Sequence, residues 1–169
     1  MVRLAAAILV GTALALGGRL IALRDSNKVE AIKDILRMIN IMETRLRFSS
    51  VPIKELLAEI ENGGCETLTF ISVCRNAVEN GDPFGEAWRE SILGCRRFCR
   101  MLPDESAKLV SMGSDIGVTD IEGQLSCCNY YREIFAASLS ETDEKRKRSA
   151  VMFPPLGILL GISAVLFFI

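Results

Sequence analysis

The last 19 residues of the chain, 151–169, contain no charged side chain. A helix of that length spans roughly 28 Å, close to the ~30 Å hydrocarbon core of a bilayer. A second uncharged run covers residues 4–18, and Arg19 behind it can extend its guanidinium toward the membrane surface. We therefore expect one transmembrane helix within residues 1–24 and another within residues 149–169.

Two other interpretations of these ends stay open. The N-terminal run also fits a secretory signal peptide, with Arg3 as its basic region and residues 13–15 as a small-residue cleavage site. The C-terminal run also fits a buried helix of a soluble core, although such helices are usually shorter. Pro154 and Pro155 stand at the start of this run, where they would kink the helix or begin a new one.

Residues 25–148 hold all 21 acidic residues and 17 of the 20 basic ones, so this middle segment has a net charge of -4. Basic residues mark both of its borders, at Arg19 and Arg24 on one side and at residues 145–148 on the other. By the positive-inside rule, both borders place residues 25–148 in the cytoplasm. The net charge of the whole chain, -1, gives no reason to expect a nucleic-acid partner.

The middle segment has the pattern of a helical bundle. Gly and Pro divide it into pieces of helix length, and no piece alternates between apolar and polar residues over a sustained stretch. Proline near the start of a piece and Asn-Gly at its end are ordinary helix boundaries. The predicted helices cover residues 26–48, 52–61, 67–79, 82–98, 104–117 and 119–148. The expected fold is all-α, a six-helix antiparallel bundle flanked by N- and C-terminal transmembrane helices.

The chain has no histidine, which removes Ser–His and Cys–His nucleophilic pairs and the commonest metal ligand. Its six cysteines should be reduced in the cytoplasm. Cys95 and Cys99 lie four residues apart on one predicted helix, and Cys127 and Cys128 would have to approach from another to form a zinc site. The spacing matches no zinc knuckle or ribbon, so we expect small core residues, no metal and no cofactor.

Arg96, Arg97 and Arg100 form the densest basic group inside the middle segment. They lie toward the end of the predicted helix 82–98, where positive charge suits the helix dipole. The group is either a solvated face or a docking patch for an acidic partner.

The same predicted helix carries the only tryptophan, Trp88, which we expect to anchor the core, with an interface role as the alternative. Glu86 and Glu90 share one face of this helix, and we interpret that face as solvated, with no sign of a cleft.

Five short motifs follow one another along nearly the whole chain. They are a Met/Leu- and Glu-containing helix face at 38–46, a Pro-led short helix at 51–56, Gly-Glu-Ala-Trp at 85–88, Gly-x-x-Asp-x-x-x-Gln at 117–124 and Leu-Gly-x-Leu-x-Gly at 156–161. In this order, behind an N-terminal apolar run and ending within the C-terminal one, the series resembles the stage III sporulation protein AB family of endospore-forming bacteria. The proline pair at 154–155 departs from the family pattern, which has Tyr and no such pair.

The resemblance implies a bundle similar to the cytoplasmic F domains of type II secretion and type IV pilus platform proteins, which sit on a hexameric ATPase. It also implies a non-catalytic component of the complex that links mother cell and forespore. The protein would lie in the outer forespore membrane, with its bundle in the mother-cell cytoplasm. Its partners would be the ATPase stage III sporulation protein AA, other proteins of the channel complex and, in a homo-oligomer, further copies of itself.

Two groups of residues are expected to contact partners, and three residues are expected to be structural. The partner contacts are Arg96, Arg97, Arg100, Gly117, Asp120 and Gln124, and the structural residues are Trp88, Gly157 and Gly161. Two alternative functions stay open. One is a membrane-tethered adaptor or sensor bundle that has no ATPase partner, and the other is a Cys-dependent membrane enzyme.

Overall fold

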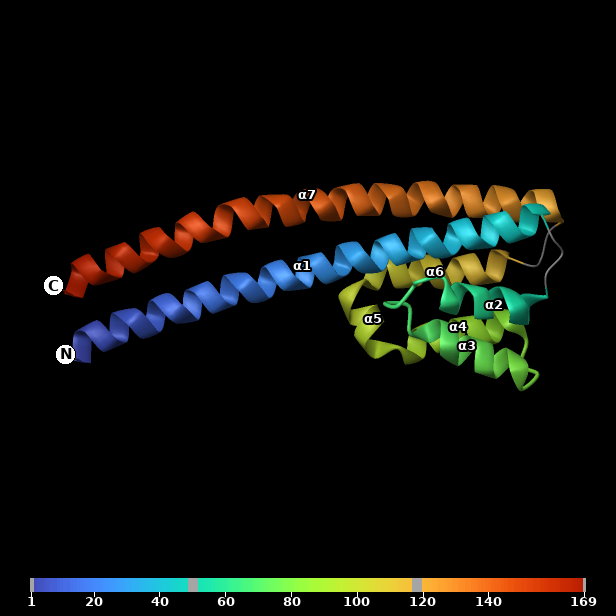
Figure 1. The fold of residues 1–169 in the computed structure, drawn as a ribbon, viewed down its shortest axis with the longest axis horizontal. Coiled ribbons are helices and arrows are strands. Elements are labelled where there is room, and N and C mark those ends of the chain that lie inside the picture. Colours follow the sequence, from blue (N-terminus) through green and yellow to red (C-terminus); the bar gives the residue numbers. More distant parts are fainter. Residues whose placement is uncertain (1, 49–51, 117–119, 169) are drawn as a thin grey trace. The chain divides into compact units, whose positions relative to one another are not determined.

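The computed structural model describes the backbone of residues 2–48, 52–116 and 120–168 and the side chains of residues 23–48, 52–116, 120–148 and 151. Within these residues the chain forms seven helices and no strand, which confirms the all-α class (Figure 1). The helices are α1 (Val2–Phe48), α2 (Ile53–Asn62), α3 (Phe70–Glu79), α4 (Phe84–Gly94), α5 (Arg96–Met101), α6 (Pro103–Asp115) and α7 (Ile121–Phe168).

The described residues include no helix that is both long enough and apolar enough to cross a membrane. The predicted anchors, residues 1–24 and 149–169, lie almost wholly outside the part of the chain whose side chains are described. The backbone of α7 remains helical through positions 154 and 155. The proline pair therefore does not begin a new helix.

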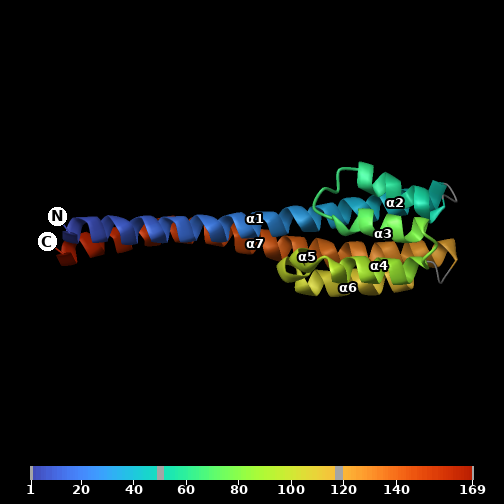
Figure 2. The same cartoon turned by 90° about the horizontal axis from the view of Figure 1, so that it is seen from below.

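The chain divides into two compact units. The first combines residues 1–29 with residues 140–169, and its parts of α1 and α7 run side by side (Figures 1 and 2). At its charged end Lys145 pairs with Glu141 at 2.7 Å. Asp143 pairs with Arg146 at 2.7 Å and with Lys147 at 2.9 Å. Much of the basic block that precedes the C-terminal apolar run is therefore paired along its own helix.

The second unit, residues 30–139, contains the hydrophobic core. The segment of α1 in this unit presents apolar side chains at spacings of three and four residues, as an amphipathic helix does. The large buried ones are Ile32, Ile35, Met38, Ile39 and Met42. From α7, Tyr131 and Phe135 enter the same core. Glu43 of α1 forms an ion pair with Arg132 of α7, which joins the two long helices at the edge of this core.

The predicted helix 82–98 is in fact two helices, so the expected number of six for the bundle is wrong. α4 ends at Gly94, and Cys95 has φ −80° and ψ 68°, outside the helical region. Leu102, with φ −133° and ψ 67°, separates α5 from α6 in the same way. Pro103 then begins α6, a position where its missing N–H costs no hydrogen bond.

The starts of α4 and α7 are capped differently. Pro83 occupies the N-cap position of α4, so Asp82 does not cap this helix. At the start of α7, the Asp120 carboxylate accepts a hydrogen bond from the backbone N–H of Gly123 at 3.0 Å. Thr119, the residue before Asp120, lies outside the described residues. The cap that the structure shows is therefore made by the acid next to it.

Candidate docking surfaces

The three arginines of α5 form an exposed group that we call the basic corner: Arg96, Arg97 and Arg100. In the described part of the chain none of them pairs with a carboxylate, and Arg100 Nε donates only to the carbonyl of Arg96, at 3.3 Å. Because the helix is interrupted at Cys95, Arg96 and Arg97 are the first two residues of α5. The expected explanation, positive charge at a helix C-terminus, is therefore wrong for these two. No ion pair within the described part of the chain explains why these three arginines lie together.

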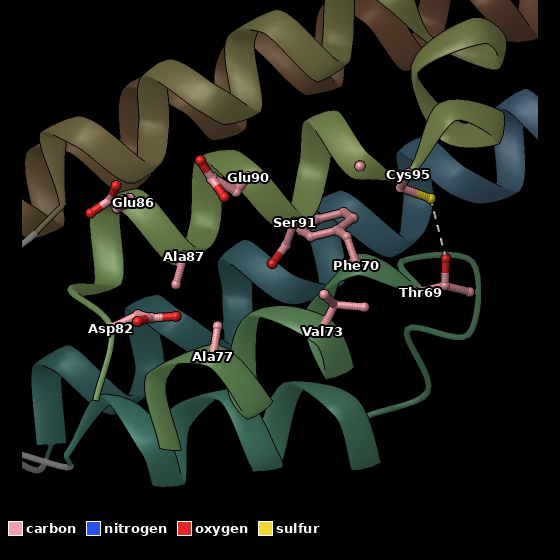
Figure 3. A pocket seen from close by; sticks show the side chains of 11 residues that line it. Thr69, Phe70, Val73, Ala77, Asp82, Glu86, Ala87, Glu90, Ser91 and Cys95 are labelled. Carbon is pink, nitrogen blue, oxygen red and sulfur yellow. Dashed lines mark hydrogen bonds between the residues drawn. The ribbon is translucent and has the colours of Figure 1, made fainter. Parts of the chain in front are cut away.

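A groove of about 680 Å³ lies between α3 and α4 (Figure 3). Phe70, Val73 and Ala77 of α3 give it apolar walls, and Ala87 and Ser91 of α4 face them. At one end the Thr69 hydroxyl lies 3.4 Å from Cys95 Sγ.

Three acids also line this groove: Asp82, Glu86 and Glu90. All three are exposed, and no ion pair involves them among the residues that the structure describes. Glu86 and Glu90 are exposed, as the solvated-face interpretation expects, but the expectation that no cleft lies beside them is wrong because both line this groove. We call this surface the acidic groove.

The start of α7 is a separate region. Gly117 lies outside the described residues, Asp120 caps α7, and Gln124 is half-buried on that helix. α5 lies at the opposite end of the second unit from the start of α7 in both views (Figures 1 and 2). The residues expected to contact partners therefore do not form a single site.

A smaller cavity, about 430 Å³, lies between the end of α6 and the first turns of α7 and is lined by residues of both helices. In it the Tyr131 hydroxyl donates a hydrogen bond to Asp115 Oδ2 at 2.8 Å. Burial, together with this bond, raises the pKa of Tyr131 well above its ordinary value. Tyr131 is therefore a neutral donor that links α6 to α7. Tyr130 next to it remains exposed.

Trp88 of α4 joins this helix to α3 and α6. Its side chain is fully buried, and its Nε1 donates to the carbonyl of Leu109 in α6 at 2.7 Å. Its ring meets Phe70 of α3 edge to face, with centroids 5.5 Å apart. A Cβ placed on Gly113 would lie 2.0 Å from Trp88 Cδ1, so α6 approaches the indole closely only because residue 113 is glycine. Gly157 and Gly161 lie outside the residues whose side chains are described.

Asp34 is a buried acid that the sequence pattern does not single out. Its side chain accepts hydrogen bonds from the backbone N–H of Thr67 at 3.0 Å and from the Thr67 hydroxyl at 2.7 Å. Arg37 pairs with the other carboxylate oxygen at 2.7 Å and also donates to the carbonyl of Gly64. Since buried carboxylates need such partners, these contacts fasten the α2–α3 loop to α1.

The cysteines in this unit do not converge on a ligand site. Cys95 contacts Thr69, while Cys99 Sγ donates to the carbonyl of Ile92 at 3.1 Å. The described Cys, Asp and Glu side chains form no group of three that could hold a metal ion. Burial raises the pKa of Cys74 to about 12 and that of Cys128 to about 11.

These two thiols should make the protein sensitive to alkali. Above their ordinary pKa of 9.0 the unfolded chain ionises both thiols, whereas the folded chain does so only near pH 11 and 12. The free energy of unfolding should therefore fall between about pH 9 and pH 12. Urea titrations across this range should show a smaller fall for Cys74→Ala/Cys128→Ala than for the unaltered chain. An equal fall in the free energy of unfolding of both chains would show that these two thiols are not the cause of the alkali sensitivity.

The described residues thus define an all-α protein with two exposed charged surfaces on one helical unit. The family model of stage III sporulation protein AB matches residues 3–169. The chain belongs to this family, which confirms the resemblance drawn from the motifs. No curated protein and no solved structure matches the chain.

Proposed function

We propose that this protein is a non-catalytic membrane component of the sporulation channel complex between mother cell and forespore. Its helical unit docks a cytoplasmic ATPase, stage III sporulation protein AA, in an F-domain-like manner. Membership of the stage III sporulation protein AB family supports a role in sporulation. The ATPase partner and the channel complex are proposed because the resemblance of the sequence motifs to this family implies them.

The observation that carries the docking proposal is the basic corner. Among the described residues, its three exposed arginines have no carboxylate partner, and all three lie on one short helix. The segment that contains this helix, residues 25–148, has a net charge of -4. Groups of this kind attract acidic surfaces and orient a partner during association. We infer that the basic corner contacts an acidic surface of the ATPase.

We also propose that residues 1–24 and 149–169 are transmembrane helices that anchor the helical unit to the membrane at both of its ends in the sequence. Support comes from the sequence: two uncharged runs, with basic residues at the inner border of each. This topology would put the helical unit in the cytoplasm. The family resemblance adds the proposal that this is the mother-cell cytoplasm and that the membrane is the outer forespore membrane. The basic corner is then accessible to a cytoplasmic ATPase.

Binding of the full chain, in detergent micelles, to the purified ATPase tests this function. Arg96→Glu/Arg97→Glu/Arg100→Glu should weaken binding roughly tenfold or more, because attraction becomes repulsion at the contact. Binding should also weaken in 1 M salt, where the Debye length is about 3 Å. Lys54→Glu is the matched control, since Lys54 is exposed on α2.

Three results would count against the proposal. Salt-insensitive binding that survives the triple reversal would move the contact away from the basic corner, with the start of α7 as the next region to test. No binding at all would favour an adaptor or sensor bundle without an ATPase. Weakening by Lys54→Glu in proportion to its smaller change of net charge would show that net charge alone, rather than the basic corner, controls the affinity.

A further inference from the structure

The acidic groove and the basic corner have complementary features. The groove has apolar walls from α3, including Val73, which is 56% exposed, and three acids without an ion pair in the described part of the chain. The basic corner has three arginines, and Leu93, 54% exposed, precedes Arg96 by three residues. One surface is therefore an apolar hollow with negative charge, and the other is an apolar side chain followed by positive charge.

We propose that the acidic groove of one copy of this protein receives the basic corner of a second copy. Leu93 of the second copy would cover the exposed apolar wall at Val73, and its arginines would pair with the groove acids. The occupant is identified by charge complementarity, because the same unit carries three unpaired acids on one surface and three unpaired arginines on the other, among its described residues.

Each copy offers one groove and one corner, so a copy can pair both with one partner in a two-fold dimer, or each with a different partner in a head-to-tail contact. Head-to-tail contacts form rings if the rotation between copies closes and open rows if it does not. The basic corner is also the contact that we propose for the ATPase, so the two partners would compete for it. The self-association itself does not depend on the ATPase proposal.

The test measures self-association of the full chain in detergent by sedimentation, with no ATPase present. A groove variant, Glu86→Arg/Glu90→Arg, should self-associate at least about tenfold more weakly than the unaltered chain. A corner variant, Arg96→Glu/Arg97→Glu, should show the same loss. All four positions are exposed, so neither variant should change the helical circular dichroism.

Rescue separates a direct contact from an indirect effect. A chain with all four reversals has complementary surfaces again and should regain self-association. An equimolar mixture of the groove variant and the corner variant should also associate, since each surface of one variant meets an opposite charge on the other. The matched control, Lys54→Glu/Glu55→Arg on α2, should behave like the unaltered chain.

Several results would overturn the proposal. They are an unaltered chain that stays monomeric at low salt, single-surface variants that associate as tightly as the unaltered chain, or a fourfold reversal that remains monomeric. Association through the apolar ends would be unaffected by all these changes and would give the second result. Failure here leaves ATPase binding untouched, because that experiment measures a different complex.

Discussion

Replacing Trp88 with alanine should lower the free energy of unfolding by about 3–5 kcal/mol, the range for removing a large aromatic side chain from a packed core. The indole is fully buried, and its N–H bonds the Leu109 carbonyl. It also fills the space left by Gly113 and meets Phe70 edge to face. The variant should therefore loosen α4 from both α3 and α6, which position the acidic groove and the basic corner.

Urea unfolding of the full chain, followed by circular dichroism, measures this loss. Tyr130→Ala is the control, since it removes an aromatic ring that is 60% exposed and should change stability by no more than about 0.5 kcal/mol. A loss below about 1 kcal/mol for Trp88→Ala would contradict the described packing.

Replacing Asp34 with alanine should cost about 2–3 kcal/mol, although the residue is a single acid on a long helix. The change leaves the backbone N–H and hydroxyl of Thr67 without their acceptor, and a half-buried donor that loses its partner is expensive. Arg37 remains 49% exposed and can return to water, so its part of the cost is small. Asp34→Asn keeps an acceptor oxygen and should lose less.

Lys33→Ala provides the comparison for Asp34→Ala. Glu30 pairs with Lys33 at 2.8 Å on the exposed side of the same helix, at the same spacing of three residues. An exposed pair contributes little, so this change should cost about 0.5 kcal/mol or less. Equal losses of the free energy of unfolding in the two variants would show that the contacts of Asp34 do not hold the α2–α3 loop to α1.

The helical class and most helix positions could be predicted because they depend on local signals. Pro52 and Pro83 mark helix starts, Asn80-Gly81 marks an end, and Gly81 adopts φ 106°, which glycine tolerates. The apolar spacing of α1 likewise identifies the side of the helix that enters the core. The break at Cys95 was missed because Gly94 alone is a weak signal for ending a helix.

The acidic groove could not be predicted because it exists only where two helices meet. Glu86 and Glu90 on one face of α4 look like a solvated face until Val73 and Ala77 of α3 lie opposite that helix. Asp34 was missed for a similar reason, since its partner Thr67 is 33 residues away. By contrast, the basic corner is a local group of residues and was found from the sequence, although its place at the start of a new helix was not.

Backbone hydrogen exchange of the full chain, with and without the ATPase, tests the central claim most directly. The measurement should use a concentration at which the chain alone is monomeric. ATPase docking on the basic corner predicts slower exchange in the peptide covering α5, with no change across α2, which carries neither charged surface. Unchanged exchange in α5, with slower exchange at residues 120–124 or nowhere in the chain, would contradict the account.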